Sequence, residues 1–190
     1  MDIETKRLLL RPLMQHDAPA LVYGLNNYAV SKNLARVKFP YSLQDADEFI
    51  ERQRGFDARS KVCAIAFRAA PEELIGIVSY EFNDSDAAEF GYWLRECCWR
   101  MGLMTEAAQG LLAHGFSEGP LGDVHSCYHL DNPNSGRILR KVGFVETHED
   151  NSLCVAQAKP VAVMRLGLSK AHWETHKKAA PKFDAAFLAT

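Results

Sequence analysis

Runs of apolar residues, some alternating with polar ones, divide the chain into strands. The β-rich runs at 61–68 (KVCAIAFR), 73–82 (ELIGIVSYEF) and 161–168 (VAVMRLGL) predict three strands. Similar patterns predict strands at 3–12, 88–94 and 124–130, and a further strand is expected around 148–154. The short segment 69–72 (AAPE) between the first two runs predicts a hairpin.

Residues typical of helix ends predict helices between these strands. Asp17 is expected to cap a helix over 17–27, and Ser42 with Asp45 three positions later predicts a second helix over 43–54. Two more helices are predicted at 105–116, ended by the glycines of 119–122, and at 135–142, closed by Gly143. This order predicts an α/β fold with one mixed sheet and helices on both faces.

Length, composition and charge exclude several classes of protein. The chain has 190 residues, 47% of them hydrophobic and 24% charged, which fits one globular domain. Its net charge of −2 argues against a nucleic-acid-binding protein, because such proteins usually present a basic face. No apolar run approaches the roughly 20 residues that span a bilayer, and the first residues lack a signal-peptide core. We therefore expect a cytoplasmic protein without a membrane partner.

Cysteines and histidines do not form a metal or disulfide pattern. The five cysteines, at 63, 97, 98, 127 and 154, include no C-x-x-C motif. Cys97 and Cys98 have no neighbouring base, so we do not expect a cysteine nucleophile. His172 and His176 have the spacing of two ligands on one helix, but no third ligand is visible. We expect no metal.

The segment 90–116 carries the main chemical signal. It passes from a strand through a turn containing Gly102 into a helix, so the first helical N–H groups are free to bind an anion, typically a phosphate. Neither G-x-G-x-x-G nor G-x-x-x-x-G-K-[ST] is present, which disfavours a general nucleotide-binding protein.

Three motifs resemble the GNAT N-acetyltransferases, and specifically their RimJ/RimL-like branch. The residues GYWL (91–94) and TEA (105–107) match that branch at the same separation, around a turn that resembles its coenzyme A pyrophosphate loop. The segment ETKRLLLRPL (4–13) is similar to its first strand, and DNPNSGRILRKVGF (131–144) to its Asn-x-x-Ser-x-Arg segment. Trp99, Arg100 and Met104 depart from the residues usual in the loop.

The resemblance implies a fold and a cofactor. It implies a strongly twisted central sheet of about six to seven strands with helices on both faces, in one domain over 1–173 followed by a tail over 174–190. The implied co-substrate is acetyl-CoA, with its arm in a space where strand 124–130 splays away from strand 88–94. The residues expected to bind it are Trp93, Leu94, Trp99, Arg100, Met101, Gly102, Leu103, Met104, Thr105, Asn132 and Ser135.

The implied reaction is direct attack of an amine on the thioester, without a covalent enzyme intermediate. Many family members place a tyrosine in the helix after the asparagine to assist the departing thiolate, but 135–144 contains none. We expect Ser135 to take that role, as a catalytic residue or only as a helix cap. Glu89 is the candidate base, and Glu149 is an alternative.

The sequence thus predicts an acetyl-CoA-dependent N-acetyltransferase acting on a protein N-terminal α-amine or a small-molecule amine, as a monomer or homodimer. The alternative is a non-catalytic acyl-CoA-binding or regulatory module with a degenerate site, which the unusual loop residues leave open. The acceptor pocket is expected from residues 26–40 and the stretch after Phe144.

Overall fold

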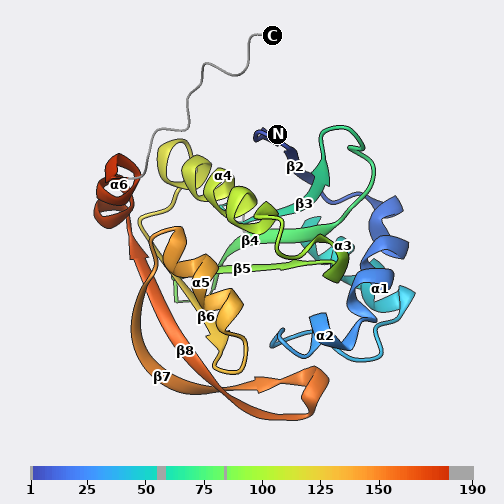
Figure 1. Ribbon diagram of the computed structural model, residues 1–190. Coiled ribbons are helices and arrows are strands. Elements are labelled where there is room, and N and C mark those ends of the chain that lie inside the picture. Colours follow the sequence, from blue (N-terminus) through green and yellow to red (C-terminus); the bar gives the residue numbers. More distant parts are fainter. Residues whose placement is uncertain (1, 55–58, 84, 180–190) are drawn as a thin grey trace.

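One twisted sheet of eight strands organises the part of the chain described by the computed structural model, residues 2–54, 59–83 and 85–179 (Figure 1). Its strand order is β1-β2-β3-β4-β5-β6-β8-β7, and β5 and β6 are its parallel pair. The strands are β1 (Ile3–Glu4), β2 (Leu8–Pro12), β3 (Lys61–Phe67), β4 (Gly76–Phe82), β5 (Ala88–Leu94), β6 (Asp123–His129), β7 (Val145–Cys154) and β8 (Lys159–Ser169). The predicted mixed α/β architecture is confirmed.

Helices cover both faces of this sheet. In Figure 1, α4 and α5 lie over one face, while α1 and α3 lie on the other side of it. The helices are α1 (Ala18–Leu25), α2 (Tyr28–Ser31), α3 (Leu43–Arg54), α4 (Leu103–Ser117), α5 (Pro133–Lys141) and α6 (Lys170–Ala179). The strands β7 and β8 form a long curved hairpin at the edge of the sheet.

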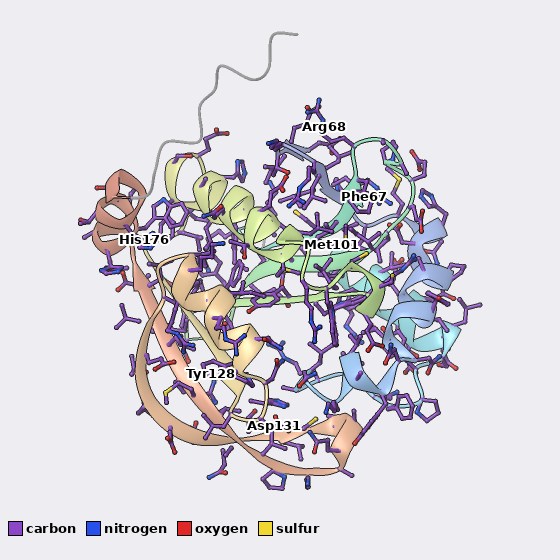
Figure 2. The ribbon with its side chains drawn as sticks, in the orientation of Figure 1. Phe67, Arg68, Met101, Tyr128, Asp131 and His176 are labelled. Carbon is purple, nitrogen blue, oxygen red and sulfur yellow. The ribbon has the colours of Figure 1, made fainter. Side chains whose placement is uncertain are left out.

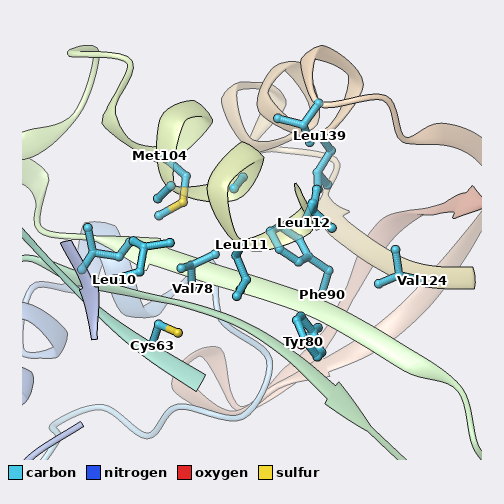
Figure 3. Close-up of a cluster of buried hydrophobic side chains, with 14 of the residues drawn as sticks. Leu10, Cys63, Val78, Tyr80, Phe90, Met104, Leu111, Leu112, Val124 and Leu139 are labelled. Atoms are coloured by element: carbon cyan, nitrogen blue, oxygen red, sulfur yellow. The ribbon is translucent and has the colours of Figure 1, made fainter. Parts of the chain in front are cut away.

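Strand alternation produces two apolar cores, one on each face. On β3, Cys63 and Ile65 enter the core beneath α4, whereas Ala64 between them packs on the side of α1 and α3. On β5, Phe90 and Trp93 divide in the same way. Figure 3 shows part of the larger core, in which side chains of α4 pack against the sheet. The period of two in these strands therefore predicts which face each residue occupies.

Three elements differ from the predictions. The predicted strand 3–12 is two antiparallel strands, because Thr5 forms a turn in which its N–H donates to the Leu8 carbonyl at 2.9 Å. This additional strand raises the total above the expected six to seven. The short helix α2 was not predicted. The expected domain limit at residue 173 falls within α6, which continues to Ala179 and packs Trp173 against Phe116. Most of the expected tail, 180–190, lies outside the described residues.

Asp17 precedes α1 as predicted, but its carboxylate does not cap that helix. Both of its oxygens accept hydrogen bonds from Arg11, each at 2.8 Å, and one also accepts from the Met14 N–H. Arg11 and Asp17 are both buried, so this bidentate pair compensates charges that water cannot reach. The role of Asp17 is therefore to join β2 to the start of α1.

The helices of the described residues are all too short or too polar to cross a membrane.

Candidate functional site

The sheet opens between β5 and β6. These parallel strands pair only through the first two residues of β5, Ala88 and Glu89, although β4 pairs with β5 along its whole length. Beyond Phe90, whose carbonyl accepts a hydrogen bond from the Ser126 hydroxyl at 2.9 Å, the two strands diverge. The splayed space expected between these strands is confirmed, and unpaired backbone of β5 faces it.

A turn with left-handed backbone lies beside this opening. Arg100 has φ +63° and Gly102, at the N-cap of α4, has φ +73°. Glycine adopts this conformation without the steric cost that a Cβ adds. No side-chain hydrogen bond caps this end of α4 within the described residues, so the N–H groups of Leu103, Met104 and Thr105 retain hydrogen-bonding capacity. The turn thus presents the positive end of a 15-residue helix.

The same turn is held by the N-terminal part of the chain. The Arg7 side chain donates to Glu106 at 2.7 Å and to the Met101 carbonyl at 3.0 Å, and the Thr5 hydroxyl donates to Glu106 at 2.7 Å. Burial alone raises the pKa of Glu106, but these bonds outweigh it and lower that pKa below its ordinary value. The carboxylate is therefore charged at neutral pH and links the first strands to the first turn of α4.

A cavity of about 590 Å³ lies in front of this turn. Its lining includes four basic side chains, Lys32, Arg100, Arg137 and Lys141, and one acidic side chain, Asp131. Figure 2 labels Met101, in the turn before α4, and Asp131, in the loop between β6 and α5. Because the basic groups and the free helix N–H groups share one cavity, it is suited to a ligand with several negative charges.

Most of the residues expected to bind the cofactor line this cavity. They are Trp93, Leu94, Trp99, Arg100, Gly102, Leu103, Met104, Thr105, Asn132 and Ser135. Met101 is not among the lining residues; its side chain is exposed, and its carbonyl is bonded to Arg7. The Met104 side chain is buried in the core, which leaves its backbone for a ligand.

Two tryptophans shape the wall along β5. The Trp99 indole N–H donates to the Leu94 carbonyl at 2.9 Å, which holds the half-exposed ring across the end of the strand. The Trp93 ring packs in the core on the α1 side, so tightly that a Cβ on Gly24 would lie 2.6 Å from it. Trp99, unusual at its position, therefore has a structural role in the wall of the cavity.

A second cavity, of about 470 Å³, lies on the side of α1 and α3. Its walls include residues 33–38 and side chains of α3, and among the described residues none after Ser135 lines it. The stretch after Phe144 contacts this wall from outside the cavity, since the Val155 N–H donates to the Ala35 carbonyl at 3.0 Å. The two cavities share the lining residues Asn33, Leu34, Tyr92, Trp93, Asn132 and Ser135. They therefore meet at the place where β5 and β6 separate.

Ser135 and Tyr92 meet at this junction. Asn132 is the N-cap of α5, and its side chain accepts from the Ser135 N–H at 3.4 Å. The Tyr92 hydroxyl lies 2.8 Å from the Ser135 hydroxyl and 3.0 Å from the Ser135 carbonyl oxygen. Burial raises the pKa of Tyr92, an effect that the bond with Ser135 only partly offsets, so this tyrosine remains protonated.

Tyr92 was not among the predicted site residues. Strand alternation places it on the same face as Phe90, toward α5, and this much the sequence contains. Its contact with Ser135 joins residues 43 positions apart and depends on how α5 packs on the sheet. The alternating pattern therefore predicts the face of the sheet on which Tyr92 lies, but not its hydrogen-bond partner.

The two candidate bases are far from equivalent. Glu89 lines the second cavity, and its carboxylate accepts from Arg36 at 2.7 Å. Glu149 is exposed on the edge strand β7 and lines neither cavity. Glu89 therefore lies in the wall of the second cavity, outside the residues that the two cavities share, and Glu149 lies in the wall of neither cavity.

No group of three or more His, Cys, Asp or Glu residues able to hold a metal occurs among the described residues. The rings of His172 and His176 face each other on α6 with centroids 6.4 Å apart.

The profile of the Acetyltransferase (GNAT) domain matches residues 7–145. This chain belongs to the GNAT acetyltransferase family. It is 27% identical over 150 residues to the uncharacterized N-acetyltransferase YoaA of Bacillus subtilis, covering 75% of this chain and 81% of YoaA. It is 33% identical over 76 residues to the ribosomal-protein-serine acetyltransferase of Escherichia coli, covering 39% of this chain and 42% of that enzyme.

Solved GNAT structures share the fold. A GNAT-family acetyltransferase from Bacillus anthracis superimposes with a TM-score of 0.76 at 20% identity, over 90% of this chain and 99% of that one. RimL, a ribosomal L7/L12 α-N-protein acetyltransferase in complex with coenzyme A, gives a TM-score of 0.72 at 22% identity, over 89% and 98%. The RimJ/RimL-like resemblance of the sequence is confirmed by these relatives, and the chain is a GNAT acetyltransferase.

Proposed function

We propose that this GNAT protein transfers the acetyl group of acetyl-CoA to a primary amine, either a protein N-terminal α-amine or a small-molecule amine. The observation that carries the proposal is the junction of two cavities through the opening between β5 and β6. Two substrates that enter from opposite faces of the sheet would meet there, as direct transfer in a ternary complex requires.

The cavity beside α4 is the proposed site of acetyl-CoA. Its phosphates would bind the N–H groups at the start of α4, and Arg100 with the other basic side chains would balance their charge. The unpaired backbone of β5 would hydrogen-bond the amide groups of the extended arm, in the manner of an added strand. The Asn132 side chain, which offers both a donor and an acceptor, lines the path.

The second cavity is the proposed site of the acceptor. The nitrogen of a neutral amine would form a bond to the thioester carbon. The carbon–sulfur bond would break, and the electron pair of that bond would go to sulfur. The proton lost from nitrogen would go to Glu89 or to water, and the Ser135 hydroxyl would donate a hydrogen bond to the departing thiolate. The name of RimL, an α-N-protein acetyltransferase, supports an acceptor at a protein N-terminus, and the name of the Escherichia coli relative supports a ribosomal-protein acceptor.

Binding of acetyl-CoA is tested by Gly102→Glu, which adds a carboxylate at a left-handed position beside the expected phosphates. Calorimetry should show the affinity for acetyl-CoA lowered by about 100-fold or more. The added carboxylate would repel the phosphates that the helix terminus and the basic groups attract. Gly122→Glu is the matched control, because open space surrounds Gly122 and it lines neither cavity. Equal affinity of folded Gly102→Glu and the wild type would refute the site.

Release of free thiol in the presence of mixed amines separates an enzyme from a non-catalytic acyl-CoA-binding module. We expect thiol release that depends on both the amine and the wild-type turn. Tight binding of acetyl-CoA without amine-dependent release would instead identify the non-catalytic alternative, so the two assays together decide between the functions.

A further inference from the structure

Two hydroxyl groups at the cavity junction share one hydrogen bond, and each has a single proton. The hydroxyl oxygens of Tyr92 and Ser135 are 2.8 Å apart, and the Ser135 carbonyl oxygen lies 3.0 Å from the Tyr92 hydroxyl. Within the described residues, the Ser135 hydroxyl finds its hydrogen-bond partner in Tyr92. The direction of this one bond therefore decides where the Ser135 proton points.

Two arrangements of the protons satisfy the geometry. If Ser135 donates to Tyr92, the Tyr92 proton goes to the Ser135 carbonyl and no proton faces the opening. If Tyr92 donates to Ser135, the Ser135 proton is free for a third group in the cavities that Ser135 lines. A negatively charged sulfur at the junction would select the second arrangement, because a charged acceptor forms the stronger hydrogen bond.

We propose that Tyr92 is a positioning residue that donates to the Ser135 hydroxyl and thereby directs the Ser135 proton toward the sulfur of coenzyme A. This inference rests on the proposed function and assigns a role to a residue outside the expected site. No proton leaves Tyr92: the thiolate departs as an anion that accepts a hydrogen bond from Ser135, which in turn accepts one from Tyr92.

The surroundings of Tyr92 suit this role. Its ring is partly buried and contacts Phe90, with ring centroids 5.8 Å apart, so the hydroxyl is held at one place on β5. Burial keeps the hydroxyl protonated, and it therefore acts as a donor throughout the neutral range. Ser135 lies in the first turn of α5, and its N–H is bonded by Asn132. Both partners of the 2.8 Å bond are thus fixed by their backbone elements.

The first experiment is a double-mutant cycle of kcat and KM for acetyl-CoA. Tyr92→Phe should lower kcat about three- to tenfold, the range for one neutral hydrogen bond, with KM changed less than about twofold. Ser135→Ala should lower kcat more, and the double variant should equal Ser135→Ala, since Tyr92 acts through Ser135. Tyr80→Phe is the control: it removes a hydroxyl from neighbouring β4, in the core and outside both cavities.

The second experiment needs no acceptor amine. Coenzyme A should bind more tightly as pH rises from about 7 to about 10, because its thiol becomes a thiolate, which accepts a stronger hydrogen bond from the Ser135 hydroxyl. Coenzyme A without its sulfur should not show this rise. Tyr92→Phe should reduce the rise at least about threefold, and Tyr80→Phe should preserve it.

The outcomes separate the two proposals. Failure of the wild type to bind coenzyme A at any pH would refute the proposed function and this inference with it. Binding that has the same pH dependence in the wild type and Tyr92→Phe would refute only the role of Tyr92. Independent, additive losses in the double-mutant cycle would also refute it, because they would show that Tyr92 does not act through Ser135. A loss confined to thermal stability would refute that role as well.

Discussion

The guanidinium of Arg7 forms an ion pair with the carboxylate of Glu106, with 2.7 Å between Nε and Oε2. The same side chain donates from Nη1 to the Met101 carbonyl, and its Nη2 would lie 3.7 Å from a Cβ on Gly102. One residue from the turn before β2 therefore holds both the left-handed turn and the first turn of α4. The proposed phosphate site is thus held in place by Arg7, which is 94 positions before Met101 in the sequence.

The first prediction concerns Arg7→Ala. Loss of the bond to Met101 should let the turn sample other conformations, so the N–H groups of α4 would be less well organised for phosphate. We expect the Kd and KM for acetyl-CoA to rise about three- to tenfold, with kcat changed less than about twofold. Isothermal calorimetry and steady-state kinetics measure these quantities.

Arg68→Ala is the control for that experiment. Arg68 pairs with Glu4 at 3.1 Å, an exposed ion pair at the same edge of the sheet that does not touch the turn. Loss of this pair should leave the affinity for acetyl-CoA unchanged, because the pair does not touch the turn. It should also change the stability of the fold little, because exposed ion pairs contribute little to stability. Equal losses of affinity in both variants would contradict a specific role of Arg7.

The second prediction is a pH dependence of stability that passes through Glu106. The folded state lowers the pKa of Glu106, so this carboxylate stabilises the fold fully above the ordinary glutamate pKa of about 4.3 and progressively less as pH falls through the folded value. The melting temperature should therefore decrease between about pH 5 and about pH 3, and Glu106→Gln should show a smaller decrease. Parallel melting curves for the two proteins over this range would show that Glu106 is not the group responsible.

The sequence predicts the fold better than the site because the two depend on contacts of different range. Alternation along β3 and β5 and the glycine before α4 are local signals, and they correctly give these strands and the turn that leads into the helix. The split between β1 and β2 was missed because it depends on hydrogen bonds of the Thr5 side chain, which apolar periodicity does not report.

Partners across the sheet were beyond reach of the local pattern. The sequence indicates that Glu89 is a strand residue and Ser135 a helix-start residue, but their partners do not follow from spacing. The bond from Arg36 to Glu89 and the contact between Tyr92 and Ser135 both depend on tertiary packing. Residue types thus indicate which side chains could take part in the chemistry, whereas their hydrogen-bond partners depend on tertiary packing.

Met101 shows a second limit of the local pattern. Its place in the turn suggested contact with a ligand, whereas its carbonyl faces Arg7 and its side chain is exposed. The sequence identifies the turn but not which of its backbone groups are already bonded by another segment of the chain.

The third prediction uses the left-handed backbone of Arg100. Arg100→Gly removes the steric cost of a Cβ at φ +63°, which is about 1 kcal/mol. The greater conformational freedom of glycine in the unfolded chain opposes this gain in stability. We therefore expect a free energy of unfolding within about 1 kcal/mol of the wild type, measured by denaturant titration. Acetyl-CoA affinity should nevertheless fall, because a basic side chain leaves the cavity.

Salt provides the check on this interpretation. If Arg100 acts through its charge, the affinity difference between wild type and Arg100→Gly should shrink as ionic strength rises. A difference that is independent of salt would indicate a change in the turn conformation instead. Arg100→Lys, which keeps the charge but loses the planar guanidinium, should recover part of the affinity.

The fourth prediction is that an α-amine is preferred over a lysine ε-amine. Glu89, the candidate base that lines the second cavity, has its carboxylate engaged by Arg36 at 2.7 Å, so that oxygen is not free to receive a proton from the amine. At about pH 7, roughly one-tenth of an amine with a pKa of about 8 is neutral, whereas less than about a thousandth of an amine with a pKa of about 10.4 is neutral. The first can therefore react without a strong base.

Two peptides of the same sequence, one with its α-amine blocked and one with its lysine blocked, separate the possibilities. Mass spectrometry should locate the added acetyl group on the free α-amine, with little product from the other peptide. Arg36→Ala supplies the physical control, because freeing Glu89 from its partner should increase the rate with the lysine amine more than with the α-amine. Acetylation confined to lysine in the wild type would contradict the prediction, and acetylation of neither peptide would direct the search to small-molecule amines.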